Sequence, residues 1–174
     1  MNAADTVRVR RHLDDVFGPD GNSTTRLGVV LRLLREEDGP VFWAVFNAAW
    51  PGGDATWARR HELVALIRRK TPWRAFAEPG DAAFYDGLPA HLTIYRGCTR
   101  RRVAGVSWTT DRDVAADFAR GHHGIPVSNP VIASVTIPKS MVLAAQTERQ
   151  KAEVLISPRI WPRRFNVVPL AGAA

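Results

Sequence analysis

The hydrophobic pattern of this 174-residue chain changes its period near residue 90, and this change limits the possible folds more than any other feature. Before residue 70, apolar side chains recur every three or four positions, which is typical of amphipathic helices. After residue 90, short apolar runs alternate with polar residues, as in strands. Helices followed by strands predict an α+β fold, with a mostly helical part over residues 1–90 and a β-rich part over residues 91–174. The hydrophobic content of 45% is enough for one compact core, so we expect a single domain.

Breaks and capping residues divide the helical part into four expected helices. Glycine, proline, aspartate and asparagine separate the apolar segments and supply N-terminal caps. The expected helices cover residues 5–17, a segment between the caps at 22–25 and the break at 38–40, residues 40–50 and residues 55–70. Residues 71–89 are rich in proline, glycine and aromatic side chains, and this composition predicts an irregular connector.

The β-rich part contains five short segments of strand character and one helix. The strands are expected at residues 92–96, 103–108, 131–137, 152–157 and around 165–168. Residues 113–120 have a helical pattern, and the preceding Thr109, Thr110 and Asp111 offer a cap for it. Gly97 follows the first strand and marks its end, so the pattern places Arg96 at a strand end.

Cysteine content and the N-terminal sequence predict where the chain is found. The single cysteine, Cys98, excludes an internal disulfide. No apolar run approaches the length that crosses a bilayer, and the N-terminus leads into charged residues without the apolar core of a signal peptide. We therefore expect a cytosolic protein without a membrane partner, a description that also fits a toxin delivered without a cleaved signal.

The charge balance favours an anionic partner. The net charge is +7, and 21 of the 24 basic residues are arginines. Nucleic acid, a dinucleotide and an acidic protein face are the partners that such a balance suits. A GC-rich coding sequence would produce the same arginine usage, so both explanations stay open.

Arg96, Ser107 and Glu153 are the candidates for ligand chemistry. A guanidinium binds phosphate oxygens through two parallel hydrogen bonds, and a small hydroxyl residue fits at the bottom of a ligand-binding site where space is limited. Taken singly, each residue has an ordinary explanation: a solvated arginine, a packed serine and an exposed charge at a strand edge.

Three motifs in the second half of the chain give these residues a joint interpretation. They are Tyr95-Arg96-Gly97, then Ser107-Trp108-Thr109, then Glu153 at the start of an apolar run. In order and placement they resemble the arginine, serine-threonine and glutamate motifs of the R-S-E class of mono-ADP-ribosyltransferases. The resemblance implies two small sheets in a split β-sandwich, crossing at a steep angle, with NAD between them. It does not cover the first ninety or so residues.

The resemblance also implies a role for each motif residue. Glu153 would stabilise the positive charge that develops on the ribose as the bond to nicotinamide breaks, and a fixed carboxylate lowers such a barrier electrostatically. Arg96 would hold the phosphates and adjacent ribose, and Ser107 would position Glu153 or the ribose.

Five further residues are expected near NAD by the same resemblance. Gly97 would let a flat ring approach the backbone, although a turn glycine explains it equally well. Phe118 would pack against nicotinamide, although a core contact is an equal alternative. Arg120 would neutralise a phosphate, although a cation at a helix C-terminus needs no ligand. Trp108 and Thr109 complete the expected NAD-binding set.

The segment before Glu153 departs from the family pattern at Lys151. Many members have a glutamate or glutamine there, which orients or deprotonates the acceptor, and a protonated lysine accepts no hydrogen bond. Modification of protein arginine is therefore in doubt, unless Glu148 or Gln150 substitutes. Otherwise the acceptor is nucleic acid, another side chain, a small molecule or water.

These observations predict an NAD-dependent mono-ADP-ribosyltransferase, a bacterial or phage toxin or effector acting in the cytosol of a host or target cell. Nucleic acid is slightly favoured over protein as acceptor, and an inhibitory or antitoxin partner is a further expectation. The alternatives are an NAD glycohydrolase and a non-catalytic protein that keeps the fold and binds NAD or nucleic acid. No metal is expected, because the adjacent His122 and His123 cannot easily face one ion. Cys98 lacks an obvious histidine partner for nucleophilic catalysis.

Overall fold

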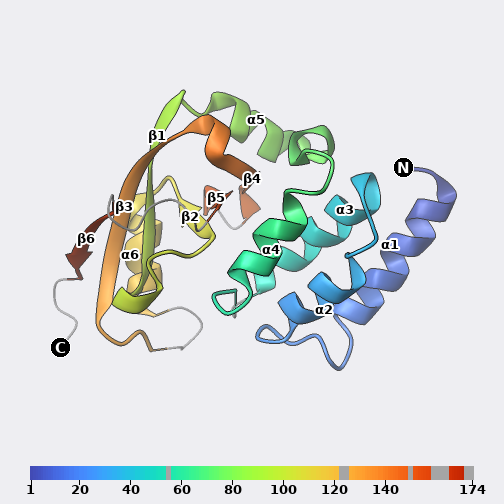
Figure 1. Cartoon of the computed structure of the whole chain (residues 1–174), viewed down its shortest axis with the longest axis horizontal. Coiled ribbons are helices and arrows are strands. Elements are labelled where there is room, and N and C mark those ends of the chain that lie inside the picture. Colours follow the sequence, from blue (N-terminus) through green and yellow to red (C-terminus); the bar gives the residue numbers. More distant parts are fainter. Residues whose placement is uncertain (54–55, 122–125, 149–150, 158–164, 171–174) are drawn as a thin grey trace. The chain divides into compact units, whose positions relative to one another are not determined.

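The computed structural model of the chain describes residues 1–53, 56–121, 126–148, 151–157 and 165–170. The chain divides into two compact units, Met1–Glu78 and Pro79–Ala174. The first unit is helical, and the second contains the strands (Figure 1). The predicted α+β class, with helices before strands, is confirmed. The first strand begins at His91, and the expectation that the two units form one domain stays a prediction.

The four predicted helices are present in the first unit. They are α1 (Ala3–Val16), α2 (Arg26–Leu33), α3 (Gly39–Ala49) and α4 (Arg60–Ile67), with 3-10 turns η1 (Trp50–Gly52) and η2 (Trp73–Phe76). α4 is shorter than predicted and begins at Arg60. The Arg60 side chain explains this start, because its guanidinium lies 3.9 Å from the centre of the Trp57 ring and donates to the Trp57 carbonyl at 2.7 Å. Trp57 is thereby held in a turn instead of a helix.

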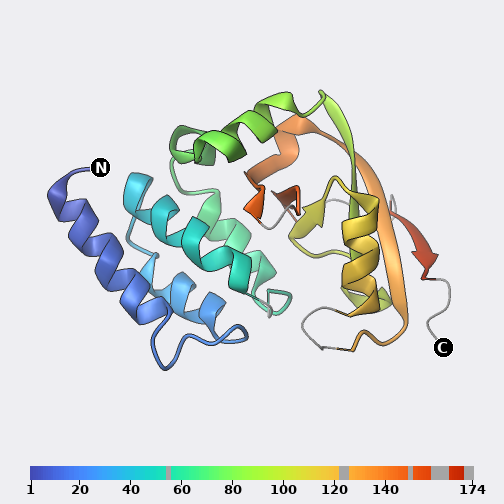
Figure 2. The same cartoon turned by 180° about the vertical axis from the view of Figure 1, so that it is seen from behind.

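α3 is the central helix of this unit. It packs against both α1 and α2 (Figure 2). Its apolar side chains are buried nearly all around the helix. Phe42, Trp43, Phe46 and Trp50 form a run of edge-on and stacked ring contacts with centroids 4.8–5.8 Å apart. The Trp43 indole donates to the Thr71 carbonyl at 2.8 Å, so its one polar atom is satisfied within the core.

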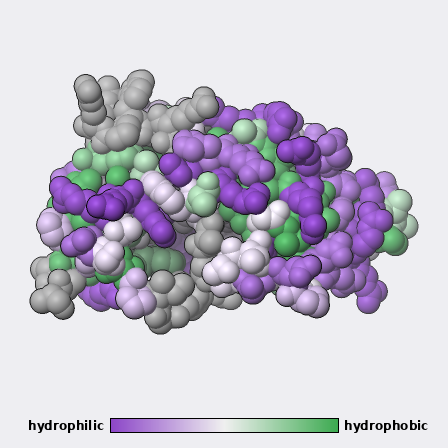
Figure 3. Space-filling model, turned by 60° about the horizontal axis from the view of Figure 1, so that its bottom comes forward, coloured by the Kyte–Doolittle hydropathy of each residue, from purple (hydrophilic) through white to green (hydrophobic). Residues whose placement is uncertain are grey.

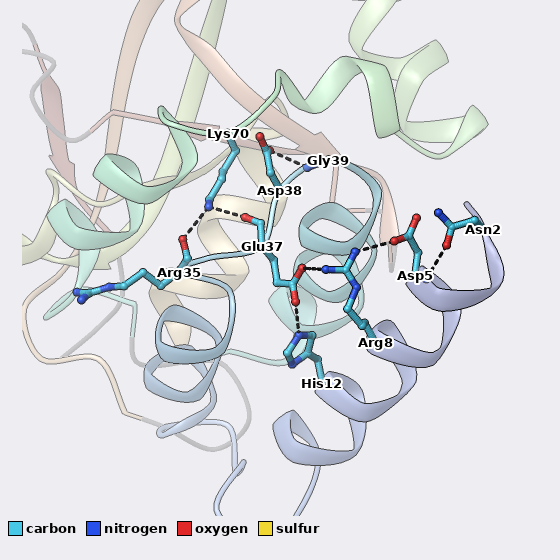
Figure 4. Close-up of polar contacts among 9 residues, drawn as sticks. All are labelled: Asn2, Asp5, Arg8, His12, Arg35, Glu37, Asp38, Gly39 and Lys70. Carbon is cyan, nitrogen blue, oxygen red and sulfur yellow. Dashed lines mark hydrogen bonds and ion pairs between the residues drawn. The ribbon is translucent and has the colours of Figure 1, made fainter.

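Polar contacts tie the connection between α2 and α3 to the rest of the unit (Figure 4). The Glu37 carboxylate accepts a hydrogen bond from the Arg8 guanidinium at 2.9 Å and lies 2.9 Å from Nε2 of the buried His12, both on α1. Lys70 donates to the Arg35 carbonyl at 2.9 Å and to the Glu37 carbonyl. One short loop is therefore attached to α1 and to the end of α4.

The stability of this unit should depend on pH through Asp38, the N-cap of α3. Its carboxylate accepts hydrogen bonds from the Thr71 backbone N–H at 2.8 Å and from the Gly39 N–H at 2.6 Å. Both bonds lower the pKa of Asp38, and the bond from Thr71 has the larger effect. A lowered folded-state pKa gives stability that is present above the ordinary value and is lost as pH falls through the folded value. Asp38→Ala should cost about 1 kcal/mol at pH 7.

Thermal unfolding of the unchanged chain and of Asp38→Ala, between neutral and strongly acidic pH, measures this effect. The difference between Asp38→Ala and the unchanged chain should shrink as pH falls below the ordinary aspartate pKa of 3.8. Asp15→Ala removes an exposed carboxylate from α1 and serves as the matched control. A difference that persisted undiminished in acid would contradict a role for the ionised Asp38 carboxylate.

The second unit contains the sheet and two helices. Its elements are α5 (Pro79–Gly87), β1 (His91–Thr99), η3 (Arg100–Arg102), β2 (Ser107–Thr109), α6 (Arg112–Arg120), β3 (Pro130–Pro138), η4 (Lys139–Met141), β4 (Val142–Gln146), β5 (Glu153–Ile156) and β6 (Asn166–Pro169). α5 corrects the prediction of an irregular connector. Pro79 suits a first helical position, and Asp81 in the first turn accepts from the Thr147 N–H and hydroxyl, both at 2.7 Å. The contact between Asp81 and Thr147, just after β4, joins residues far apart in the sequence, so no local pattern predicts it.

The strands form one antiparallel six-stranded sheet in the order β4-β5-β2-β1-β3-β6. β1 and β3 pair along their whole lengths, from His91 with Pro138 to Thr99 with Pro130. β1 and β2, in contrast, share only the register pair Tyr95 with Thr109. The sheet thus consists of two three-stranded halves joined by one pair of residues. Across the described strands no second, separate sheet is present, in contrast to the two crossing sheets that the resemblance implied.

The prediction that Arg96 ends a strand is wrong. β1 continues for three residues beyond it, and Gly97 pairs with Ile132 inside the strand. Gly97 is needed for packing rather than for a turn: a Cβ atom there would overlap the Ala115 carbonyl oxygen and lie 2.6 Å from the Ala119 backbone nitrogen. α6 therefore lies against β1 at a distance that only glycine allows (Figures 1 and 2).

The helix that approaches β1 has the predicted cap and an inner face of small residues. Asp111 caps α6 by accepting from the Asp113 and Val114 N–H groups. The buried side chains of α6 are Ala115, Ala116 and Ala119, which pack with Ile132 of β3 and with the partly buried Tyr95 and Leu170.

The surface has the composition expected of a chain that is 24% charged. In the view of Figure 3, hydrophilic side chains cover most of the coloured surface, and hydrophobic ones show between them in scattered groups. None of the helices that the structure describes has the length and apolar content needed to span a bilayer.

Candidate active site

The Arg96 guanidinium lies where the two halves of the sheet part. Nη1 donates to the Ser107 carbonyl of β2 at 2.5 Å, and Nε donates to the Arg102 carbonyl at 3.2 Å. The guanidinium rests on Gly105, where a Cβ atom would come within 2.6 Å of Nε and Nη2. Burial lowers the pKa of Arg96, and the negative charge of Glu153 opposes this shift. The guanidinium is thus fixed by two main-chain acceptors and lies in the field of the Glu153 carboxylate.

Ser107 and Glu153 form a direct hydrogen bond. The Ser107 hydroxyl donates to Glu153 Oε1 at 2.5 Å. The register explains this contact: Ser107 lies opposite Leu155 and Thr109 opposite Glu153, so Ser107 and Glu153 are diagonal neighbours within reach of a long side chain. The structure therefore brings together all three residues that the motifs singled out, with Ser107 linking the other two through its carbonyl and its hydroxyl.

Thr109 fixes the backbone that leads into Glu153. Its hydroxyl donates to the Lys151 carbonyl at 2.6 Å and accepts from the Asp111 N–H at 3.0 Å, and the Thr110 N–H donates to the Ala152 carbonyl. Ala152 has a φ of 43°, a left-handed conformation that costs an alanine about 1 kcal/mol. The buried Thr109 thus stabilises a strained residue immediately before Glu153.

Two of the residues expected to bind NAD have structural roles in this unit. The Trp108 side chain is buried, and its indole donates to the Gly105 carbonyl at 2.9 Å, so it is not placed to stack on a ligand. Gly97 has the α6 backbone over the position that a side chain would occupy. The approach of a flat ring on that side of the strand is therefore blocked.

Phe118 and Arg120 lie on α6, and each contacts a charged side chain. The Lys151 ammonium lies 4.9 Å from the centre of the half-buried Phe118 ring. Arg120 is exposed and pairs with Asp117 at 2.6 Å, one turn earlier on the same helix. Binding of a ring to Phe118 or a phosphate to Arg120 stays a prediction.

The loop before β5 is described only in part. Glu148 is exposed, and its carbonyl accepts from the Lys151 N–H at 3.4 Å. Gln150 lies outside the described residues. That Glu148 or Gln150 substitutes for the glutamate or glutamine of the family at position 151 therefore stays a prediction.

Neither a nucleophilic cysteine nor a metal centre is supported by the described residues. Burial raises the pKa of the Cys98 thiol, against the opposing influence of Arg96 and Arg102, so the thiol stays protonated at neutral pH. No cluster of potential metal ligands occurs among the residues that the structure describes. His122 and His123 lie outside them.

Sequence reasoning missed Gly105 as part of this site. It leaves room for the Arg96 guanidinium, and its carbonyl accepts from the Trp108 indole. The only signal in the sequence is a lone glycine between Ala104 and Val106, which a loop explains equally well.

Comparison with known proteins assigns no family to this site. A scan against models of protein families, a search of curated proteins and a search of solved structures each gave no match.

Proposed function

We propose that the chain is an NAD-dependent mono-ADP-ribosyltransferase. The observation that carries this proposal is the hydrogen bond of 2.5 Å from the Ser107 hydroxyl to the Glu153 carboxylate, beside a guanidinium held by the Ser107 carbonyl. The serine, the glutamate and the arginine come from three different strands, and the hydrogen bond from Ser107 orients the carboxylate. The same three residues carry the resemblance to the R-S-E class.

The chemistry assigned to each side chain follows from its charge and its contacts. Ser107 restrains one oxygen of Glu153, so the carboxylate is oriented before substrate binds. As the bond between nicotinamide and ribose breaks, the electron pair leaves with nicotinamide and the ribose becomes cationic, and Glu153 stabilises that cation. Arg96 binds the phosphates, which are already charged in the ground state.

We further propose that the two halves of the sheet act as the two sides of the NAD site. The support is the single register pair between β1 and β2, compared with nine pairs between β1 and β3. Arg96 lies at this junction and spans it through the Ser107 carbonyl. In this proposal the two halves take the place of the two sheets of the split β-sandwich that the resemblance implies.

Incubation of the purified chain with NAD labelled in its adenosine part tests the proposal. Release of nicotinamide and transfer of label to an acceptor in a lysate would support the transferase. Free ADP-ribose without labelled acceptor would support an NAD glycohydrolase, in which water takes the place of the acceptor. Absence of nicotinamide release with every lysate fraction would exclude both enzymes and leave a binding protein.

Gly105→Ala should weaken NAD binding without any change in a charged residue. The added methyl group would displace the Arg96 guanidinium from its contacts with the Ser107 and Arg102 carbonyls. We expect a loss of affinity on the order of tenfold, which corresponds to one hydrogen bond of a charged group. The displaced atoms belong to the end of a flexible side chain, but the two hydrogen bonds that they lose are within the protein, so stability should fall as well, by about 1 kcal/mol.

Calorimetric titration with NAD, together with thermal unfolding, measures both quantities. Gly87→Ala is the control, since a Cβ atom there meets no atom within 4 Å. Unchanged affinity in Gly105→Ala would show that the position of the Arg96 guanidinium does not matter for binding.

A further inference from the structure

The turn η3 places three consecutive arginine side chains on the surface next to the candidate active site. Arg100, Arg101 and Arg102, which we call the arginine turn, are all exposed, and no ion pair with a described carboxylate is found for any of them. The backbone of the turn is fixed at both ends. The Arg100 N–H donates to the Asn129 carbonyl at 3.3 Å, and the Arg102 carbonyl accepts from Arg96 Nε at 3.2 Å. The three cations are therefore presented on an ordered main chain.

The charge of the arginine turn is not compensated by neighbouring segments. Residues 96–110, which include the turn, contain no aspartate or glutamate, and neither do residues 118–147, which include β3, the strand paired with β1. The whole unit Pro79–Ala174 has 12 basic and 7 acidic residues. A cluster of unpaired guanidinium groups in such surroundings attracts a polyanion.

We propose that the arginine turn binds the sugar–phosphate backbone of a nucleic acid. Each of the three exposed guanidinium groups can form a bidentate contact with a phosphate. The turn itself contains no aromatic side chain on which a base would stack, so the contact is with the backbone and is independent of sequence. If the proposed function holds, this nucleic acid is the ADP-ribose acceptor, because the carbonyl of Arg102 also holds Arg96.

Binding is measured without NAD, so that its outcome does not depend on catalysis. The probe is a fluorescent single strand of about 20 nucleotides, as DNA and as RNA, titrated with the full chain at several salt concentrations. In the variant Arg100→Gln, Arg101→Gln, Arg102→Gln, affinity should fall at least about tenfold, and the slope of log K against log salt should become shallower by roughly 2. The matched control is Arg10→Gln, Arg32→Gln, Arg68→Gln, which removes the same charge from exposed positions on the helical unit.

Several results would overturn the proposal. Equal losses in the two triple variants would show that net charge alone drives binding, and no binding by the unchanged chain would exclude a nucleic-acid surface. Complete displacement of the probe by an equimolar acidic peptide would assign the turn to a protein partner. Arg101→Glu, a single change at an exposed side chain, should weaken binding in the same direction even if the triple variant proves unstable. If the chain does not bind the probe through the arginine turn, the proposal that it turns over NAD is not affected. If it does not turn over NAD, the binding results are still valid.

Discussion

Glu153→Gln should reduce nicotinamide release at least about a hundredfold while leaving the affinity for NAD nearly unchanged. Glutamine has almost the same shape as glutamate, and its side-chain oxygen can still accept the hydrogen bond from Ser107. Only the negative charge is lost, and that charge acts on a cation that exists in the transition state and not in bound NAD. Single-turnover rates and calorimetric titration with NAD separate the two quantities.

Two further variants make this result specific. Ser107→Ala keeps the carboxylate charge but removes the hydrogen bond of 2.5 Å that orients it, so its rate should fall between those of Glu153→Gln and the unchanged chain. Glu36→Gln makes the same chemical change at an exposed position in the helical unit and should leave the rate unchanged. Retention of most activity in Glu153→Gln would mean that the motif assignment is wrong.

The parts of the fold that local sequence determines were predicted correctly. The cap of α6 is an example, because Asp111 bonds to N–H groups only two and three residues away. The helices of the first unit are similar, since their apolar spacing alone requires a buried face. Their ends were less accurate, as at α4, whose start depends on how Arg60 packs against Trp57.

Long-range pairing decided what the sequence could not predict. The helical state of α5 is supported by the contact of Asp81 with Thr147, 66 residues away. The contact between Ser107 and Glu153 depends on a register that places Thr109, and not Ser107, opposite Glu153. Motif order suggested that these residues meet, but hydrogen bonds between strands set which atoms touch.

Gly97 shows how a local pattern can be misleading. A glycine after an alternating run predicts the end of a strand, and the prediction that Arg96 ends β1 followed from it. The glycine is instead required because the α6 backbone lies directly against the strand at that point. This contact is a matter of tertiary packing, which a local sequence pattern does not reveal. A structural requirement of this kind can be tested without any assumption about function.

Gly97→Ala should therefore be the most destabilising small substitution considered for the second unit. The new methyl group would overlap the main chain of α6, which cannot rotate away as a side chain can, so we expect a loss of about 3 kcal/mol or more. The corresponding fall in Tm is on the order of 10 °C. Gly87→Ala adds the same group where no atom lies within 4 Å and should leave Tm unchanged or slightly higher.

A second-site test distinguishes main-chain overlap from ordinary crowding of side chains. If Gly97→Ala acted by crowding the alanine methyl groups of α6, adding Ala115→Gly or Ala119→Gly would restore stability. The atoms in the way are the Ala115 carbonyl oxygen and the Ala119 nitrogen, which remain in place when either side chain is removed. Neither second change should restore Tm, and each should lower it further, because glycine weakens the helix by roughly 1 kcal/mol. Thermal unfolding of the double variants and hydrogen exchange across β1 and α6 measure the effect. Restoration of Tm by either glycine would show that the α6 backbone does not lie as close to Gly97 as described.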